Sequence, residues 1–391
     1  MLRFDQNTDF SLVLGGPLYQ LFLRAHLAGP VHTHLLRRIL VLVLWAWLPL
    51  MFLSVISGKG WGGVAVPFFD DLDIQIRFLV VLPILIGAEI IVHQRLGLIL
   101  RGLVERGIII EAEKPRFQKI IASALRLRNS VPAEIGLLIA VYTLGIWIWR
   151  ERMSLPGPTW FATPTSGRVD LNAAGYWYAW VSIPVFQFIL LRWYYRLFIW
   201  WRLLWQVGRL SLRLIPTHPD RVGGLQLLSI SIIAFEPVWL AHTVMISGMI
   251  ANRIWHMQAR LPEFKFEIGG VILLVLILAL APLAIFSLHL ARTRRQGLRE
   301  YGLLAQEYVR EFDDKWIRQG ADEEKLLGSP DLQSLADLAN SFNVIREMKL
   351  FPIDHKMVMQ LIITLLLPLL PLFLTMFPLD QLLARLVRLA F

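Results

Sequence analysis

Apolar residues in this chain gather into long runs, and each run is separated from the next by a polar segment. An α-helix rises about 1.5 Å per residue, so about 20 apolar residues cross the roughly 30 Å hydrocarbon core of a bilayer. The runs of that length lie near residues 39–57, 77–94, 133–149, 176–195, 225–250, 268–290 and 357–376. The pattern predicts an all-α integral membrane protein, a polytopic helical bundle of about seven transmembrane helices with cytosolic helical extensions.

The prolines of two runs bear on their path and chemistry. Pro237 lies near the middle of the fifth run, and Pro368 and Pro371 lie in the last one. A proline removes one helical hydrogen bond, frees the carbonyl one turn earlier and kinks the helix. For the last run two paths stay open, a bent crossing of the bilayer and a re-entrant loop, and its length favours the crossing.

Two polar segments show helical patterns of their own. Residues 115–128 place apolar side chains at helical spacing opposite basic ones, which predicts a helix that lies on the inner leaflet or packs on neighbouring cytosolic segments. Ser329, Pro330 and Asp331 have the order of a cap, a first-turn proline and an early acid, which predicts a second cytosolic helix over 330–348. Its apolar face needs a partner from this subunit or from a neighbouring one.

The composition agrees with a membrane protein and excludes several chemistries. Of the 391 residues 56% are hydrophobic and 17% charged, against about 45–50% and 25% in soluble domains. The chain has no cysteine, so disulfides, cysteine-ligated zinc, iron–sulfur clusters and thiol nucleophiles are excluded. Walker A, HExxH, GxSxG and kinase motifs are absent, so we predict no cofactor and no metal site, and ATP-driven transport by this chain loses support.

The net charge of +10 would suggest nucleic acid as a partner of a soluble protein. Here the basic residues flank apolar runs, so we predict binding to a lipid bilayer with anionic inner-leaflet lipids and no nucleic acid. Of the 39 Lys and Arg residues, 29 fall in four segments. These segments are 1–38, 93–132, 192–222 and 291–356. By the positive-inside rule the N-terminus is cytosolic and the C-terminus outside.

These boundaries predict three parts. Residues 1–290 form a transmembrane bundle, 291–356 a cytosolic helical region, and 357–391 the last transmembrane helix with an outer interfacial tail. The arginines at the inner end of the fourth run lack a strict every-third spacing, so we interpret them as inner-leaflet anchors and not as a voltage sensor. They are Arg192, Arg196, Arg202, Arg209 and Arg213.

Glu236 is the strongest candidate for function. It lies about eleven residues, or roughly 16 Å, into the fifth run and is followed by Pro237. A carboxylate at that depth costs at least about 2.5 kcal/mol and is expected to face the bundle interior or an aqueous cavity. Together with the carbonyl that Pro237 frees, it makes a polar spot able to hold a proton, a cation or water. The alternative is a protonated Glu236 that joins helices for structure alone.

Other ion or proton pathway candidates are Glu89, His93 and His242. Glu89 and His93 are four residues apart on one helix face, where they can relay a proton or share a metal, or form an interfacial pair satisfied by water. His242 and Glu134 are lesser candidates because each can lie near a wet interface.

The link between the fourth and fifth runs contains His218, Asp220, Arg221, Gly223 and Gly224. A basic loop with a histidine at a helix start can hold an anion or gate a pore mouth. The alternative is a rigid corner that aims the helix, since the two glycines permit a tight turn.

The stretches IPTHPDRVGGL (215–225) and GSPDLQSLADLANSFNVIREM (328–348) resemble a family of uncharacterised bacterial multi-pass inner-membrane proteins. The resemblance implies the bacterial cytoplasmic (inner) membrane and transfers no site residue. The leading hypothesis from the sequence is a channel or secondary transporter for a small ion or solute, as a homo-oligomer. The alternatives are a sensor or scaffold acting through 291–356, and a membrane enzyme on lipids that uses His218 and Asp220.

Overall fold

The computed structural model describes residues 10–27, 29, 34–152, 157–165, 168–318 and 328–376. Apart from a two-stranded hairpin, β1 (Ala162–Thr165) and β2 (Arg168–Leu171), the regular structure there is helical. Seven helical stretches are long and apolar enough to cross a membrane. They run Leu35–Ile56, Leu72–Glu105, Val131–Trp149, Ala173–Val207, Leu225–Met257, Leu261–Ala284 and His355–Leu374. Each overlaps one predicted run, so the polytopic all-α fold is confirmed.

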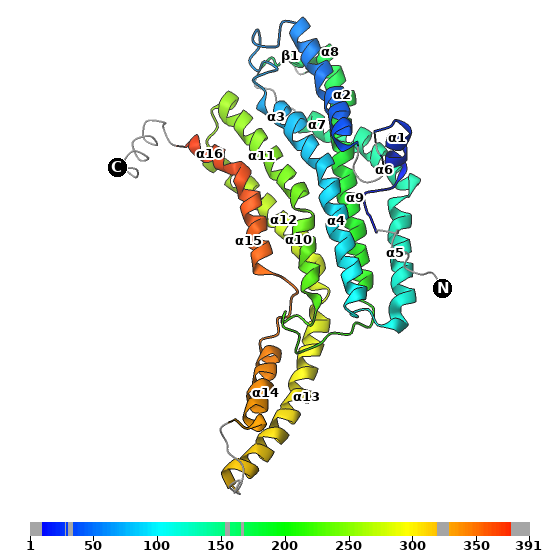
Figure 1. Cartoon of the computed structure of the whole chain (residues 1–391). Helices are drawn as coiled ribbons and strands as arrows, with labels where there is room; N and C mark the ends of the chain where they lie inside the picture. The colour runs from blue at the N-terminus through cyan, green and yellow to red at the C-terminus, as the bar shows by residue number, and fades with distance from the viewer. Residues whose placement is uncertain are drawn as a thin grey trace.

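Three long helices form the centre of the bundle (Figure 1). They are α4 (Leu82–Glu105), α9 (Ile183–Val207) and α11 (Glu236–Met257). Their shared core includes the fully buried Trp193, Trp200 and Trp239. The fifth stretch is 67% buried over its most apolar window, whereas the first is only 17% buried. The outer helices therefore expose large apolar surfaces, as expected for helices that are surrounded by lipid hydrocarbon.

The remaining membrane-length helices surround this centre. They are α2 (Leu35–Ile56), α6 (Val131–Ala140) with α7 (Ile146–Arg152), α12 (Lys265–Ala284), and α15 (His355–Leu366) with α16 (Leu370–Leu374). Three of the stretches have a short helix in their first part, namely α3 (Leu72–Ile76), α8 (Ala173–Trp177) and α10 (Ile230–Ala234). Packing of α2 and α11 on α4, and of α12 on α9, closes the bundle.

The helix predicted over 115–128 is α5 (Lys114–Arg128), and it runs along α9 (Figure 1). Phe117 and Ala124 are buried between the two helices. Arg202 of α9 donates to Ser123 Oγ at 3.1 Å, and Tyr195 OH donates to the Leu127 carbonyl at 2.8 Å. Of the two alternatives, the structure favours packing on a neighbouring segment.

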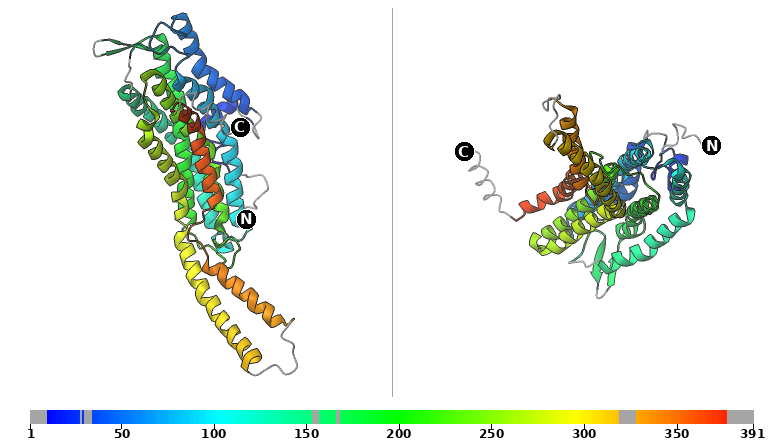
Figure 2. Two further views of the ribbon diagram at one scale, coloured as in Figure 1. Left: turned by 90° about the vertical axis from the view of Figure 1, so that its left-hand side faces the viewer. Right: turned by 90° about the horizontal axis from the view of Figure 1, so that it is seen from below.

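A helical hairpin projects beyond the bundle, as Figures 1 and 2 both show. It consists of α13 (Ser287–Asp313) and α14 (Pro330–Arg346). The Ser329 hydroxyl caps α14 by accepting from the Asp331 amide at 3.1 Å, as its sequence predicts. Phe342 packs against Gly302, and Tyr308 OH donates to the Asp331 carbonyl at 3.0 Å. Part of the apolar face of α14 thus packs on α13 of this subunit, while Leu332 of that face stays 43% exposed.

The last stretch bends at a 3₁₀ turn, Leu367–Leu369, between α15 and α16. Ser247 of α11 donates to the Pro368 carbonyl at 2.6 Å and holds the bend against the bundle. Its 20 residues suffice for a bent crossing. The predicted interfacial tail, residues 377–391, lies outside the described residues.

Prolines inside the bundle leave carbonyls that side chains from neighbouring helices satisfy. Trp201 Nε1 donates at 3.1 Å to the Leu278 carbonyl, one turn before Pro282. Tyr142 OH likewise donates at 3.3 Å to the Trp180 carbonyl, one turn before Pro184. Each of these carbonyls therefore joins two helices, and the same rule applies at Pro237.

Candidate functional site

Buried arginines and glutamates from several helices meet where the sequence places the cytosolic boundary. The Glu89 carboxylate of α4 binds Arg38 of α2 through one oxygen and Arg196 of α9, at 2.8 Å, through the other. The side chains of Arg38, Arg196 and Glu89 are only 8%, 6% and 12% exposed. The Arg196 guanidinium also lies 4.7 Å from the centre of the Trp193 ring. This arrangement joins α2, α4 and α9 through one shared carboxylate.

A second acid extends the network toward the N-terminal segment. Glu134 Oε1 of α6 lies 3.3 Å from Arg192 Nε of α9. Glu134 Oε2 accepts from the amide of Leu18, at the start of α1 (Pro17–Arg24), at 2.8 Å. Arg128, the last residue of α5, donates to the Ser11 carbonyl at 2.6 Å. Glu134 and Arg128 therefore both attach the segment 10–24 to the network.

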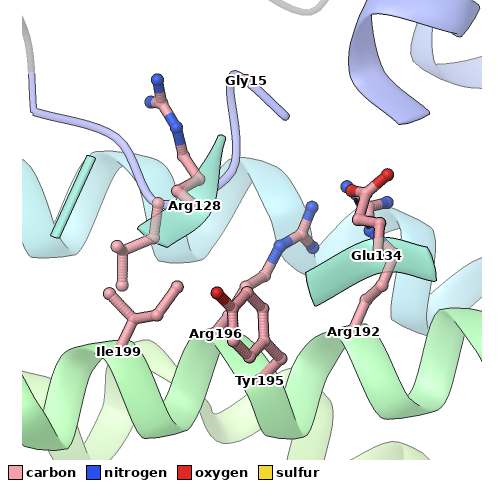
Figure 3. A pocket seen from close by; sticks show the side chains of 8 residues that line it. Gly15, Arg128, Glu134, Arg192, Tyr195, Arg196 and Ile199 are labelled. Atoms are coloured by element: carbon pink, nitrogen blue, oxygen red, sulfur yellow. Dashed lines mark ion pairs between the residues drawn. The ribbon is translucent and has the colours of Figure 1, made fainter. Parts of the chain in front are cut away.

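A small cavity lies inside this network (Figure 3). Its lining is Leu12, Gly15, Arg128, Glu134, Arg192, Tyr195, Arg196 and Ile199. The space inside that water can occupy is about 10 Å³, which is room for about one water molecule. Arg128 comes from α5 and Arg192 and Arg196 come from α9, and the backbone at Gly15 passes above them (Figure 3). We call Arg38, Arg128, Arg192 and Arg196, with Glu89 and Glu134, the arginine cluster.

Positive charge exceeds negative charge in the arginine cluster. Its four arginines have only Glu89 and Glu134 as acids in contact with them among the described residues. Burial and the neighbouring Arg196 charge lower the pKa of Arg128 from its ordinary value. The Nε of Arg38 is buried without a hydrogen-bond partner. The cluster is thus electropositive and has one unused donor, on Arg38, which does not line the cavity.

Sequence reasoning found the acids of this site but not its bases. Glu89 and Glu134 stand out as acids in apolar runs, whereas Arg192 and Arg196 were expected to anchor the inner leaflet. The structure buries both arginines inside the bundle, and this corrects the expectation for them. Their i, i+4 spacing puts them on one helix face, together with Tyr195 and Ile199 of the cavity. This common helix face is the feature of the sequence that could have indicated a shared site for the two arginines.

The partnership predicted between Glu89 and His93 remains a prediction. Both Glu89 oxygens are bound by arginines, which leaves the carboxylate little capacity for a metal. In the part of the chain that the structure describes, no group of three or more His, Asp or Glu side chains has a geometry that could hold a metal ion.

Glu236 lies at the first turn of α11, where the helix dipole favours a negative charge. Its side chain is 14% exposed and its Oε2 lies 3.8 Å from Arg95 Nη1 of α4. Gln360 donates to it at 2.8 Å and Thr364 also donates, both from α15. Arg95 donates as well to the Ile233 carbonyl, one turn before Pro237. Arg95 thus occupies the place beside Pro237 where the sequence predicts a proton, a cation or water.

His242 connects α11 to α9. Its Nδ1 lies 2.7 Å from the Val238 carbonyl, which only accepts, so Nδ1 carries the proton. Nε2 then accepts from Tyr194 OH. This neutral tautomer satisfies both ring nitrogens of the buried His242.

The loop between α9 and α10 is organised around the Asp220 carboxylate. Asp220 accepts from the amides of Val222 (2.9 Å), Gly224 (3.1 Å) and Gln226 (3.2 Å), and His218 Nδ1 lies 2.8 Å from Oδ1. The Asp220 carboxylate therefore occupies the place that a bound anion would take at this helix start. The geometry favours a rigid corner over an anion site or an active site for lipids.

Backbone conformation and a second contact keep this corner in place. Gly223 and Gly224 have φ of 64° and 97°, which side chains disfavour. Arg221 pairs with Glu347 at 3.0 Å, and the Lys349 amide donates to the Arg221 carbonyl at 2.8 Å. The corner thus links the bundle to the end of the α13–α14 hairpin.

Comparisons with protein-family models, with curated proteins and with solved structures give no match for this chain. The geometry of the two arginine–glutamate sites is therefore the basis for any functional proposal.

Proposed function

We propose that this chain is a secondary transporter that carries a small ion through its helical bundle. The observation that carries the proposal is that two charged networks, one at Glu89 and one at Glu236, join different helices inside the membrane-length part of the bundle. Charged side chains there are expensive, and they commonly line substrate or ion pathways. A water-sized cavity at the first network suits a carrier, which holds its ion in an enclosed site.

The contacts at Glu236 are of a kind that helix movement can break and re-form. Its partners come from α4 and α15, so a shift of α15 past α11 exchanges the Gln360 and Thr364 hydrogen bonds without changing the fold. The bend at Pro368, held by Ser247, supplies a point about which the end of this stretch can move. Sequence-based expectations of a bacterial cytoplasmic membrane and of a homo-oligomer complete the proposal.

Flux measurements in proteoliposomes test the proposal. Purified protein would be reconstituted with sodium, potassium, proton and chloride gradients in turn. We expect at least one flux above that of empty vesicles and a loss on the order of tenfold in Glu236→Gln, which keeps the shape but removes the charge. Glu307→Gln, on an exposed part of α13, is the matched control and should behave like the parent chain. If Glu236→Gln folds and leaves every flux unchanged, the transport proposal loses its basis.

A second candidate function is a membrane-anchored scaffold or sensor. The α13–α14 hairpin projects from the bundle and exposes Leu303 (62%) and Ile317 (67%) on its surface. Deleting residues 320–350 should abolish capture of a partner and spare ion flux if the hairpin serves that purpose. Loss of flux together with capture would instead place the hairpin in the transport machinery.

A further inference from the structure

We infer that Glu236 binds and releases one proton while the chain stays folded. The inference deepens the proposed function and rests on it in one respect: in a transporter this proton would be the carried or the coupling ion. Proton binding itself can be measured without transport.

The contacts of Glu236 favour a proton over a metal cation. Arg95 of α4 lies 3.8 Å from Oε2, and Gln360 and Thr364 of α15 both donate to the carboxylate. These partners present N–H and O–H groups to Glu236, whereas hard cations require several oxygen ligands at once. A single carboxylate among donors suits a proton, which needs only one oxygen.

The two partners from α15 can serve the carboxylate in both protonation states. A hydroxyl group donates as well as accepts. When Oε1 of Glu236 gains a proton, the new O–H bond can donate to Thr364 Oγ1, and the hydroxyl proton of Thr364 can turn to the carbonyl of residue 360, one helical turn earlier. Gln360 continues to donate to Oε2 at 2.8 Å. Protonation therefore leaves both partners with hydrogen bonds.

Arg95 also keeps a partner when Glu236 is neutral. Its guanidinium donates to the Ile233 carbonyl, which Pro237 frees from helical pairing. Its contact with Glu236, at 3.8 Å, is longer than a hydrogen bond. Neutralising Glu236 therefore removes an attraction from Arg95 but leaves its hydrogen bond in place.

Glu89 shows the opposite arrangement. Its two carboxylate oxygens are bound by Arg38 and Arg196, and both arginines are buried. Guanidinium groups only donate, so a proton on Glu89 would leave two buried charges without compensation, which is strongly destabilising. Of these two acids, Glu89 is therefore a fixed anion and Glu236 is the one that can exchange a proton.

Polar side chains lead from the hairpin end of the bundle toward Glu236. Gln226 donates to Asp354 at 3.1 Å at the exposed start of α15. Gln360 follows on the same helix about one and a half turns later and is exposed as well. The Glu236 side chain itself is 14% exposed, and α15 packs along α10 and α11 beside it (Figure 1). These side chains outline a polar route for the proton.

Infrared spectroscopy of the full chain in a neutral detergent tests proton binding. A protonated carboxyl group has a C=O stretching band that an ionised carboxylate lacks. Spectra of the parent chain and of Glu236→Gln would be recorded over the pH range in which circular dichroism shows both proteins folded. We expect the parent to gain a band on acidification that Glu236→Gln lacks. Glu307→Gln, on an exposed part of α13, is the matched control and should keep this band.

Substitutions of Thr364 assign the band to this site. Thr364→Val keeps the shape but removes the acceptor of the protonated carboxyl group, so the band should move to higher wavenumber. Thr364→Ser restores a hydroxyl and should return the band toward its position in the parent chain. Thr293→Val, on the projecting hairpin, is the matched control and should leave the band unmoved.

Proton flux into proteoliposomes, driven by a membrane potential and followed with an enclosed pH dye, links the site to transport. Glu236→Gln should lower this flux on the order of tenfold. Glu236→Asp keeps an acid that can carry a proton and should retain more of the flux than Glu236→Gln does.

Three outcomes would overturn the inference. They are no Glu236 band while the chain is folded, a band that Thr364→Val leaves unmoved, and a sodium, potassium or chloride flux that needs Glu236 without any proton flux. The last of these leaves the transporter standing. A Glu236 band without any ion flux supports proton binding and contradicts only the transporter.

Discussion

Replacing Glu89 by glutamine tests whether the arginine cluster holds the bundle together. The glutamine has the same shape but no charge, so Arg38 and Arg196 would be left without the acid that both of them bind. Removing one partner of a buried ion pair typically costs about 3–5 kcal/mol, because the other charge stays buried without compensation. Here one acid serves two arginines that are 8% and 6% exposed. We therefore expect a loss of about 4 kcal/mol in the free energy of unfolding.

A matched surface pair gives the control. Glu347 binds Arg221 at 3.0 Å, but the two side chains are 50% and 51% exposed. Exposed pairs contribute about 0–1 kcal/mol, so Glu347→Gln should change stability by less than about 1 kcal/mol. In Arg38→Gln combined with Glu89→Gln, the loss should be smaller than the sum of the two single losses, because the residues are in contact.

Denaturant titration in detergent micelles, followed by tryptophan fluorescence, measures these differences. The chain contains 15 tryptophans, several of them in the core around α9, so the signal reports on the bundle. A Glu89→Gln protein as stable as Glu347→Gln would refute the reasoning, because the arginines would then be compensated by something other than Glu89.

Two further predictions concern buried carboxylates outside the membrane-length helices. Asp71 is buried and accepts from Trp160 Nε1 at 2.9 Å, and burial raises its pKa from 3.8 to about 6. The folded chain thus binds the Asp71 proton more tightly than the unfolded chain. About 3 kcal/mol in the free energy of unfolding, present below pH 4, should therefore be lost as the pH rises through about 6. Asp71→Asn should remove this pH dependence in unfolding titrations. Asp220→Ala removes the acceptor of three backbone amides. It should lower the free energy of unfolding by about 2–3 kcal/mol in the same assay and speed proteolysis at 215–225. The control Asp337→Ala, at an exposed position, should have neither effect.

The seven membrane-length helices could be predicted from the sequence because hydrocarbon imposes a local requirement. Each span must satisfy its own backbone hydrogen bonds and present apolar side chains over a fixed length, and neither condition depends on the rest of the chain. The cap at Ser329 is equally local, because its acceptor and donor are two residues apart. For the same reason the sequence identified Glu236 and Glu89 as acids in apolar surroundings.

Only the tertiary structure decided what those acids meet. Arg196 and Glu89 are 107 residues apart, and Arg38 and Glu89 are 51 apart. Which helix face turns inward depends on packing among several helices. The sequence therefore suggests that Arg192 and Arg196 anchor the chain to lipid, whereas the structure buries both inside the bundle. The carbonyl freed by Pro237 could be foreseen from covalent geometry. The contact between Arg95 of α4 and that carbonyl could not be foreseen, because side-chain partners across a bundle are set by the depth and rotation of whole helices.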